Sequence, residues 1–385
     1  MAKTILKSAA VALLLTSTSI ANAETAQSGA AGQQSFPVES EFEKFQPKPS
    51  NSPTRIDFSI WDDALSYFVF PMGYSIREGA PTVDAELGTR RVYGHESRYR
   101  LEGNRVIFSY LDDDIKASLT EYRKDLESTL DRVDITKLGR NEQLAFWMNL
   151  HNVAVIEQIA LDYPVSQPSR IKVNGSDLPL DETPFITVSG VNMSPKDIRT
   201  KIVYPNWDNP KVIYGFFRGE IGGPSILRNA FTGANVGDLL DESAAEFVNS
   251  LRGTQKNGSK LDVSKIYDEA RPFFFQNWET DIRDHLLTYS NAEVTSLIER
   301  TSEVRARLYE TDVSDLANGE RDPNYNFVVS GENVKGLGLP SSIQRLLREH
   351  SQKLQKIEKD KDLQGRVKII NVGDLTKPKE PDEVE

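Results

Sequence analysis

One apolar segment of the sequence carries polar side chains that could bind a ligand or transfer a proton. Asn149 and Asn152 are three residues apart in the segment 141–162, so in a helix they share a face. A buried amide must find hydrogen-bond partners, so the pair either ties neighbouring loops to the helix or lines a cleft. His151 projects about 100° away from Asn152. Without an obvious acidic partner, it favours a structural role over a catalytic one.

A second set of candidates lies in the tight, glycine-rich loop 218–225. General acid–base catalysis needs a group with a tuned pKa within hydrogen-bond reach of the substrate. Glu220 in this loop, together with Glu142 and His151, is of a suitable type. Ser225 is the only nucleophile beside the glycines, and the sequence identifies no base near it.

Glu142 opens the predicted helix, where a carboxylate favours the helix dipole. Alternatively it faces the loop at Arg218. If Arg218 and Glu220 approach the two asparagines, they form a polar pocket able to hold a small anion or an amide. The predicted ligand-binding residues are Asn149, Asn152, Trp147, Arg218 and Gly219, and the candidate catalytic residues are Glu142, His151 and Glu220.

Composition excludes several kinds of chemistry. The 385 residues include no cysteine, which rules out thiol nucleophiles, thiolate metal sites and redox pairs. No phosphate loop, zinc motif, calcium loop or Gly-x-Ser-x-Gly elbow is present, and we expect no cofactor and no metal. The net charge of −11 argues against nucleic acid as a partner, because phosphate binding needs concentrated Lys and Arg.

The first 23 residues follow the order of a secretory signal peptide. Lys3 and Lys7 precede an apolar run, and residues 21–23 fit the small-x-small cleavage pattern. Threonines from Thr16 onward interrupt the run too early for a membrane span, which needs about 20 apolar residues. We therefore expect cleavage near Ala23 and a mature protein that is periplasmic or secreted. Removal of the two lysines makes its net charge −13.

The mature chain divides into three predicted parts. Residues 24–54 are rich in Gln, Ser, Ala and Pro and predict a disordered tether. Residues 55–330 have the apolar content of a globular domain. Residues 331–385 form an extension with a helix and an acidic, disordered tail. The apolar spacing in 343–357 covers only two heptads, so we expect this helix to dock on the domain rather than form a coiled coil.

The globular part predicts an α+β fold. Its central buried helix, 141–162, packs on a mostly antiparallel sheet with further helices around it, because hairpin signals outnumber strand–helix–strand units. We expect strands at 91–99, 105–110 and 211–217, and a hairpin of 186–188 with 191–193. Ser194 caps a helix that begins with Pro195. The aspartates 112–114 suit helix capping better than metal binding.

The stretch 141–152, Asn-Glu-Gln-Leu-Ala-Phe-Trp-Met-Asn-Leu-His-Asn, resembles the signature of the domain of unknown function 547 family. That signature usually reads Asn-Glu-x-x-Ala-Phe-Trp-Ile-Asn-x-Tyr-Asn. The resemblance covers roughly residues 54 to 330. The family usually carries a His on the strand after Pro210, followed by Cys-Gly-x-x-Ser-Cys-Pro. Here Ile213 and the loop 218–224 stand at those positions, and His151 replaces the tyrosine.

Two functions are compatible with these observations. The missing thiols and histidine favour a non-catalytic domain of the cell envelope that binds a small ligand, a glycan or an envelope protein. The alternative is a hydrolase or transferase with carboxylate or histidine chemistry, in a pocket between the helix at 141–162 and the loop 218–224.

Overall fold

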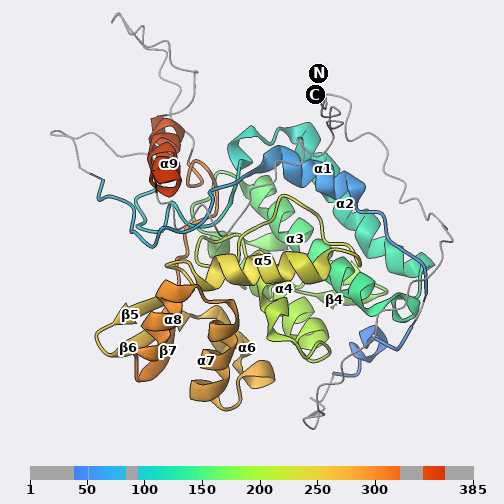
Figure 1. The fold of residues 1–385 in the computed structure, drawn as a ribbon. Helices are drawn as coiled ribbons and strands as arrows, with labels where there is room; N and C mark the ends of the chain where they lie inside the picture. The colour runs from blue at the N-terminus through green and yellow to red at the C-terminus, as the bar shows by residue number, and fades with distance from the viewer. Residues whose placement is uncertain (1–38, 51, 84–93, 321–340, 360–385) are drawn as a thin grey trace, which may run out of the picture.

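The computed structural model describes residues 39–50, 52–83, 94–320 and 341–359. Helices dominate this part of the chain (Figure 1). The α-helices are α1 (Ser59–Phe68), α2 (Asp113–Arg132), α3 (Arg140–Asp162), α4 (Pro195–Asp197), α5 (Val236–Val248), α6 (Ile266–Phe274), α7 (Trp278–Tyr289), α8 (Ala292–Glu299) and α9 (Ser341–Lys359). Short 3-10 helices are η1 (Glu43–Phe45), η2 (Phe108–Tyr110), η3 (Ile135–Lys137), η4 (Pro168–Arg170), η5 (Val173–Gly175), η6 (Leu180–Glu182) and η8 (Pro210–Gly215), and η7 (Ile198–Val203) is a π-helix.

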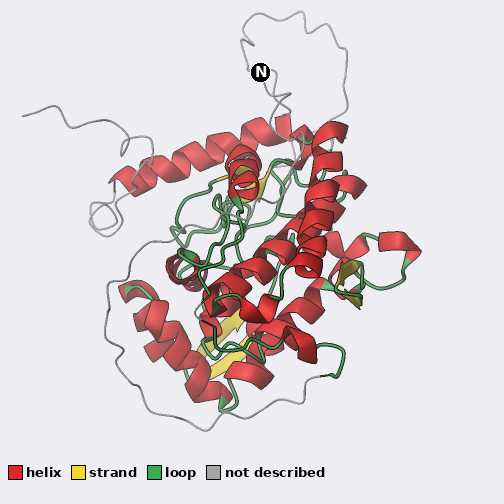
Figure 2. Ribbon diagram, turned by 90° about the vertical axis from the view of Figure 1, so that its right-hand side faces the viewer, coloured by secondary structure: helices red, strands yellow, loops and turns green. Residues whose placement is uncertain are grey.

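The strands are short, and Figure 2 shows them among the helices. They are β1 (Val69–Phe70), β2 (Arg105–Val106), β3 (Ile186–Val188), β4 (Val191–Met193), β5 (Thr254–Asn257), β6 (Lys260–Ser264) and β7 (Glu303–Leu308). The pairs β1–β2, β3–β4 and β5–β6 are antiparallel, and β6–β7 is parallel. The α+β class and the mostly antiparallel pairing are therefore confirmed.

Helix α3 is the central element of the core. It is apolar almost all round, so nearly every side chain along it is buried. The helix ends at Asp162, just before Tyr163 and Pro164, because the residue before a proline disfavours the helical conformation. Its main neighbours are the helices α2, α4, α5, η6 and η7, whereas the three-stranded sheet packs with α6, α7 and α8 (Figure 1). Helix-on-helix packing thus buries α3, where the sequence predicted a sheet.

Several local predictions are confirmed. Asp112 caps α2, because its side chain accepts a hydrogen bond from the Ile115 amide at 2.9 Å. Ser194 and Asp197 form a reciprocal capping box at the start of α4. The hairpin of β3 and β4 has the predicted bounds and turns through Ser189 and Gly190, both at positive φ.

Three predicted strands need correction. The segment 211–217 lies mostly in η8, because Pro210 sets a helical φ and the Asn209 side chain caps the Lys211 amide at 3.0 Å. In the segment 105–110, only the first two residues form a strand, and η2 follows. Residues 94–99 bend and turn rather than extend, and residues 91–93 lie outside the described part of the chain.

The predicted tether also needs correction in its second part. Phe42 and Phe45 are both 2% exposed and belong to the main hydrophobic core. The ring of Phe45 meets that of Trp147 edge to face, with centroids 5.2 Å apart. Two aromatic rings bury enough apolar surface to order a polar, proline-containing segment. The predictions for residues 1–38 and 360–385 lie outside the described residues.

Helix α9 docks on the domain, as predicted. Ile343 and Leu346 pack with Met72, Leu316 and Ala317 in a second, smaller hydrophobic cluster. In Figure 1, α9 lies away from the sheet of β5, β6 and β7. Among the helices that the structure describes, none combines the length and the apolar character needed to cross a bilayer.

The packing of Phe45 predicts that Phe45→Ala lowers the free energy of unfolding by about 3 kcal/mol, through lost burial and the cavity left against Trp147. Urea denaturation of the full chain measures this. Glu41→Ala, an exposed change in the same segment, is the control and should leave stability within about 0.5 kcal/mol. Equal stability of the two variants would mean that the segment does not contribute to the core.

Candidate functional site

The two asparagines of α3 bind backbone. The Asn149 side chain donates to the Phe231 carbonyl at 2.7 Å and accepts from the Phe231 amide at 3.1 Å. The Asn152 side chain donates to the Gly215 carbonyl at 3.0 Å and accepts from the Phe217 amide at 2.9 Å. Both side chains are buried. Each one forms hydrogen bonds with backbone groups of a neighbouring segment that regular secondary structure leaves without partners. This geometry corresponds to the loop-tying alternative.

Glu142 has a role that the sequence did not predict. Its carboxylate is 1% exposed and accepts from the Ile56 amide at 2.8 Å and the Gly233 amide at 3.1 Å. Arg55 completes the group with an ion pair at 3.4 Å. A Cβ at position 233 would come 2.3 Å from the carboxylate, so any other residue there would have to displace the Glu142 side chain. The carboxylate therefore holds two chain segments against α3. It also lies in the first turn of α3, as predicted for a role at the helix dipole, and its contacts are with these segments rather than with Arg218.

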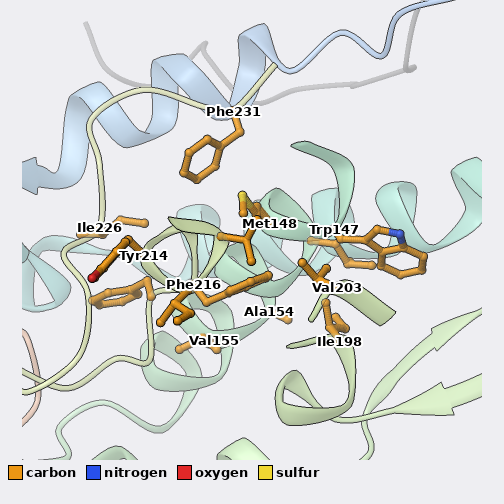
Figure 3. Packing of buried hydrophobic residues seen from close by; sticks show 14 of the residues in the cluster. Trp147, Met148, Ala154, Val155, Ile198, Val203, Tyr214, Phe216, Ile226 and Phe231 are labelled. Atoms are coloured by element: carbon orange, nitrogen blue, oxygen red, sulfur yellow. The ribbon is translucent and has the colours of Figure 1, made fainter. Parts of the chain in front are cut away.

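Trp147 and Gly219 also have packing roles. Trp147 is fully buried and meets the Phe146 ring at 5.1 Å between centroids. Figure 3 shows it within the apolar core. Gly219 has a φ of +79°, and a Cβ there would lie 2.4 Å from the Ile159 side chain. The glycine thus lets the loop 218–224 lie directly on α3.

A small cavity lies where this loop meets α3. Its volume is about 60 Å³, enough for a few water molecules or one functional group of a ligand. Of the predicted site residues, only Arg218 and Glu220 line it. The full lining consists of Val155, Pro168, Ser169, Pro179, Leu180, Asp181, Arg218, Glu220 and Tyr309.

A four-membered ion-pair network adjoins the cavity and contributes Asp181 and Arg218 to its lining. Arg199 is fully buried and donates to Asp181 at 2.6 and 2.7 Å. It also donates to Glu269 at 2.9 and 3.0 Å. Arg218 binds the same Glu269 at 2.7 and 3.2 Å. Two guanidinium groups thus balance two carboxylates.

The network fixes the protonation of its carboxylates. Burial by itself would raise the pKa of Glu269, but Arg199 and Arg218 outweigh it and lower that pKa to about 2. At Asp181, burial by itself would raise the pKa, but the charge and hydrogen bonds of Arg199 outweigh it and hold this pKa well below its usual range. Asp181 keeps 37% of its side chain exposed. It therefore presents a permanent negative charge at the cavity.

His151 lies behind this network. Its Nδ1 is 3.1 Å from the Asn152 carboxamide oxygen, which requires the proton on Nδ1. Its Nε2 then accepts from Arg199 at 2.9 Å. Burial and the charge of Arg199 lower the pKa of His151 to about 3. Both ring nitrogens are occupied, so the imidazole serves as a neutral acceptor for the central arginine.

Glu220 behaves differently from the paired carboxylates. Burial raises its pKa to about 7, and the hydrogen bond from the Tyr309 hydroxyl opposes this only in part. The loop that carries it is held by backbone hydrogen bonds at 2.8 Å from Ile221 to Asp312 and from Gly222 to Glu310. The cavity therefore contains a carboxyl group that changes protonation near neutral pH, on a fixed backbone.

Comparison with known proteins places part of the chain in a family. Residues 135–248 match the model of a family described as protein of unknown function, DUF547. Over this segment the chain belongs to the DUF547 family. The match is narrower than the range 54–330 over which the sequence resembles the family. Searches of curated proteins and of solved structures found no significant match.

The DUF547 segment supplies only part of the cavity. It contributes Asp181, Arg218 and Glu220 to the lining, and the chain that follows it contributes Tyr309. The ion-pair network likewise combines Arg199 of the segment with Glu269 on α6. Sequence analysis did not identify four of these residues, because they come from separate parts of the chain: Asp181, Arg199, Glu269 and Tyr309. One available signal was a charged residue between apolar neighbours, since Arg199 lies among Ile198, Ile202 and Val203.

The state of His151 predicts a specific pH dependence. Unfolded, it takes up a proton near pH 6.5, whereas in the folded DUF547 segment it stays neutral down to about pH 3. Stability is therefore lost as the pH falls from 6.5 towards 3. At pH 5, His151→Gln should reduce the slope of unfolding free energy against pH by about one proton, or roughly 1.4 kcal/mol per pH unit.

Urea titrations between pH 4.5 and 6 measure this slope. The control is Leu161→Gln, a neutral change at an exposed position of the same helix, which should keep the wild-type slope. A slope unchanged in His151→Gln would show that His151 is protonated in the folded chain.

Proposed function

We propose that the chain is an exported, non-catalytic binding domain of the cell envelope, and that its ligand inserts a polar group into the cavity beside Arg218 and Glu220. The signal-peptide pattern of residues 1–23 supports export. A small ligand, a glycan or a peptide of an envelope protein has suitable groups. No nucleic acid is expected for a chain with this negative charge.

The lining of the cavity supports a hydroxyl- or amide-bearing ligand. Asp181 offers acceptor oxygens, and Glu220 donates when protonated and accepts when ionised. Arg218, whose terminal nitrogens bind Glu269, adds a cation to the lining. Val155, Leu180 and two prolines add apolar surface. The volume of about 60 Å³ admits one group of the ligand, and the rest would lie on the surface around the opening.

One observation weighs most for binding over catalysis. Arg218 stands where the DUF547 resemblance implies the first cysteine, and its guanidinium is committed to Glu269. Ile213, at the position of the usual histidine, is fully buried in the core. Ser225, the serine beside the glycines, is bonded to Glu246 at 3.0 Å and does not line the cavity. The serine–carboxylate pair that this loop does form, Ser225 with Glu246, therefore lies outside the cavity.

Blocking the cavity tests the proposal. Ser169 is exposed on the rim, so Ser169→Trp should fill the opening without disturbing the ion pairs. We expect native mass spectrometry of the chain from the extracytoplasmic fraction of its own cells to detect a bound molecule, and Ser169→Trp to lose it. The mass of the chain itself should correspond to a start at Glu24.

Ser302→Trp is the matched control, because Ser302 is exposed and does not line the cavity. It should retain the bound molecule. A ligand that survives in Ser169→Trp, or that is missing from the wild type, would contradict binding at this cavity. A chain that still begins at Met1 would contradict export.

Glu220 favours a second candidate function, a hydrolase or transferase. A carboxyl group with a pKa of about 7 in a cavity is suited to general acid–base catalysis. Asp181 and Tyr309 would then orient the substrate.

A panel of ester, glycoside and peptide substrates tests this alternative. If the cavity is catalytic, Glu220→Gln should reduce turnover by about 100-fold or more, and the wild-type rate should change around pH 7. Glu310→Gln alters a neighbouring carboxylate outside the lining and should retain activity. Equal turnover in wild type and Glu220→Gln would exclude Glu220 as the acid or base.

A further inference from the structure

Helix α9 is fastened to the domain by buried polar contacts as well as by apolar packing. Arg100 is 1% exposed and donates to both oxygens of Glu349, at 2.6 and 2.9 Å. Arg345 donates to the His95 carbonyl at 2.6 Å. A bidentate ion pair with a buried arginine fixes the orientation of the helix as well as its position. The helix therefore docks in one defined register.

Lys353 is the most buried charged residue of α9. Its side chain is 3% exposed. Its ammonium group donates to the carbonyls of Met72, Gly73 and Leu101, at 3.0, 3.3 and 2.7 Å. Three carbonyl acceptors satisfy the three donors of the group. The lysine thus joins two segments that are separate in sequence. One is 72–73, and the other is Leu101, which directly precedes 102–104.

The segment 102–104 in turn contacts the loop that bears the cavity. The Asn104 amide donates to the Ser225 hydroxyl at 3.3 Å, and its side chain donates to the Ile226 carbonyl at 2.8 Å. The Asn104 side chain also accepts from the Met72 amide at 3.2 Å. Met72 therefore lies between Lys353 on one side and Asn104 on the other.

Arg252 fixes the same loop. It donates to the Gly223 carbonyl at 2.7 Å and forms an ion pair with Glu246. Gly103 leaves space for this guanidinium, since a Cβ there would lie 2.6 Å from the Arg252 Nη1. The turn at 103 is thus packed directly against the arginine. A shift of residues 101–104 would therefore also displace Arg252 and the loop.

We propose that α9 regulates the cavity: its docking through Lys353 holds segment 101–104, and with it Arg252, so that the loop 218–226 keeps the conformation that presents Arg218 and Glu220. The chain of contacts is continuous from Lys353 to Gly223. Undocking of α9 frees the Leu101 and Met72 carbonyls and loosens the loop. The consequence for ligand binding rests on the function proposed above, but the mechanical coupling does not.

Hydrogen exchange in the full chain tests the coupling. The amides of Ile221, Gly222 and Gly223 are all hydrogen-bonded, so they report loop opening. Lys353→Met removes the ammonium group and keeps the apolar stem. We expect it to speed exchange by about ten-fold both at 101–104 and at these three amides, without a change in the hairpin of β3 and β4, which packs against α2.

Lys356→Met is the matched control. Lys356 lies on the same helix, 58% exposed, and pairs only with an equally exposed Glu78 among the contacts described. It should leave all rates unchanged. Faster exchange at 101–104 with normal rates at 221–223 would overturn the proposal, as would equal acceleration by both variants. If Lys353→Met does not fold, Glu349→Gln, which weakens the pair with Arg100, is measured at the same amides.

The ligand experiment remains separate. Native mass spectrometry that finds no ligand in the wild type would remove the proposed function and leave the exchange result intact. Faster exchange at 221–223 together with a weakened ligand signal in Lys353→Met is the result expected if both proposals hold.

Discussion

The charge of one buried arginine constrains the arrangement around the cavity. A guanidinium group cannot be transferred into the interior unless carboxylates and hydrogen-bond acceptors compensate for lost hydration. Arg199 meets this requirement with Asp181, Glu269 and His151, which come from three different elements. The elements η6, η7, α3 and α6 are thus held in one relative position by a single side chain. Removal of either carboxylate leaves charge uncompensated, which typically costs about 3–5 kcal/mol.

The same physical requirement explains the polar residues of the family signature in this chain. Helix α3 is buried along almost its whole length, and it is surrounded by loops and short helices whose backbone groups lack regular partners. Glu142 accepts hydrogen bonds from two such amides. Asn149 binds both the carbonyl and the amide of Phe231. Asn152 binds the carbonyl of Gly215 and the amide of Phe217. The signature therefore describes how a buried helix fastens its irregular surroundings. In this chain, the described contacts of Glu142, Asn149 and Asn152 thus serve the packing of the helix.

Sequence reasoning succeeded where one local feature decides the structure. The apolar span of α3, the capping box at Ser194 and the hairpin turn at Gly190 all follow from neighbouring residues. It failed at 211–217, where an apolar run suggested a strand and Asn209-Pro210 instead starts a 3-10 helix. It also missed that Phe45 packs on Trp147, because tertiary burial overrides a polar composition. The cavity could not be foreseen beyond Arg218 and Glu220, since Asp181, Arg199, Glu269 and Tyr309 meet only in the folded chain.

The composition of the network also determines what Glu220 can do. The positive charge of Arg218 favours the Glu220 carboxylate and lowers its pKa. The negative charges of Asp181 and Glu310 raise the same pKa, so the nearby charges oppose one another. Burial then dominates at Glu220 and brings its pKa to about 7. Because Tyr309 and Glu310 lie outside the segment that matches the DUF547 family, the pKa of Glu220 is not set by that segment alone. The electrostatics of the loop 218–224 thus depend in part on residues that follow the family segment in the chain.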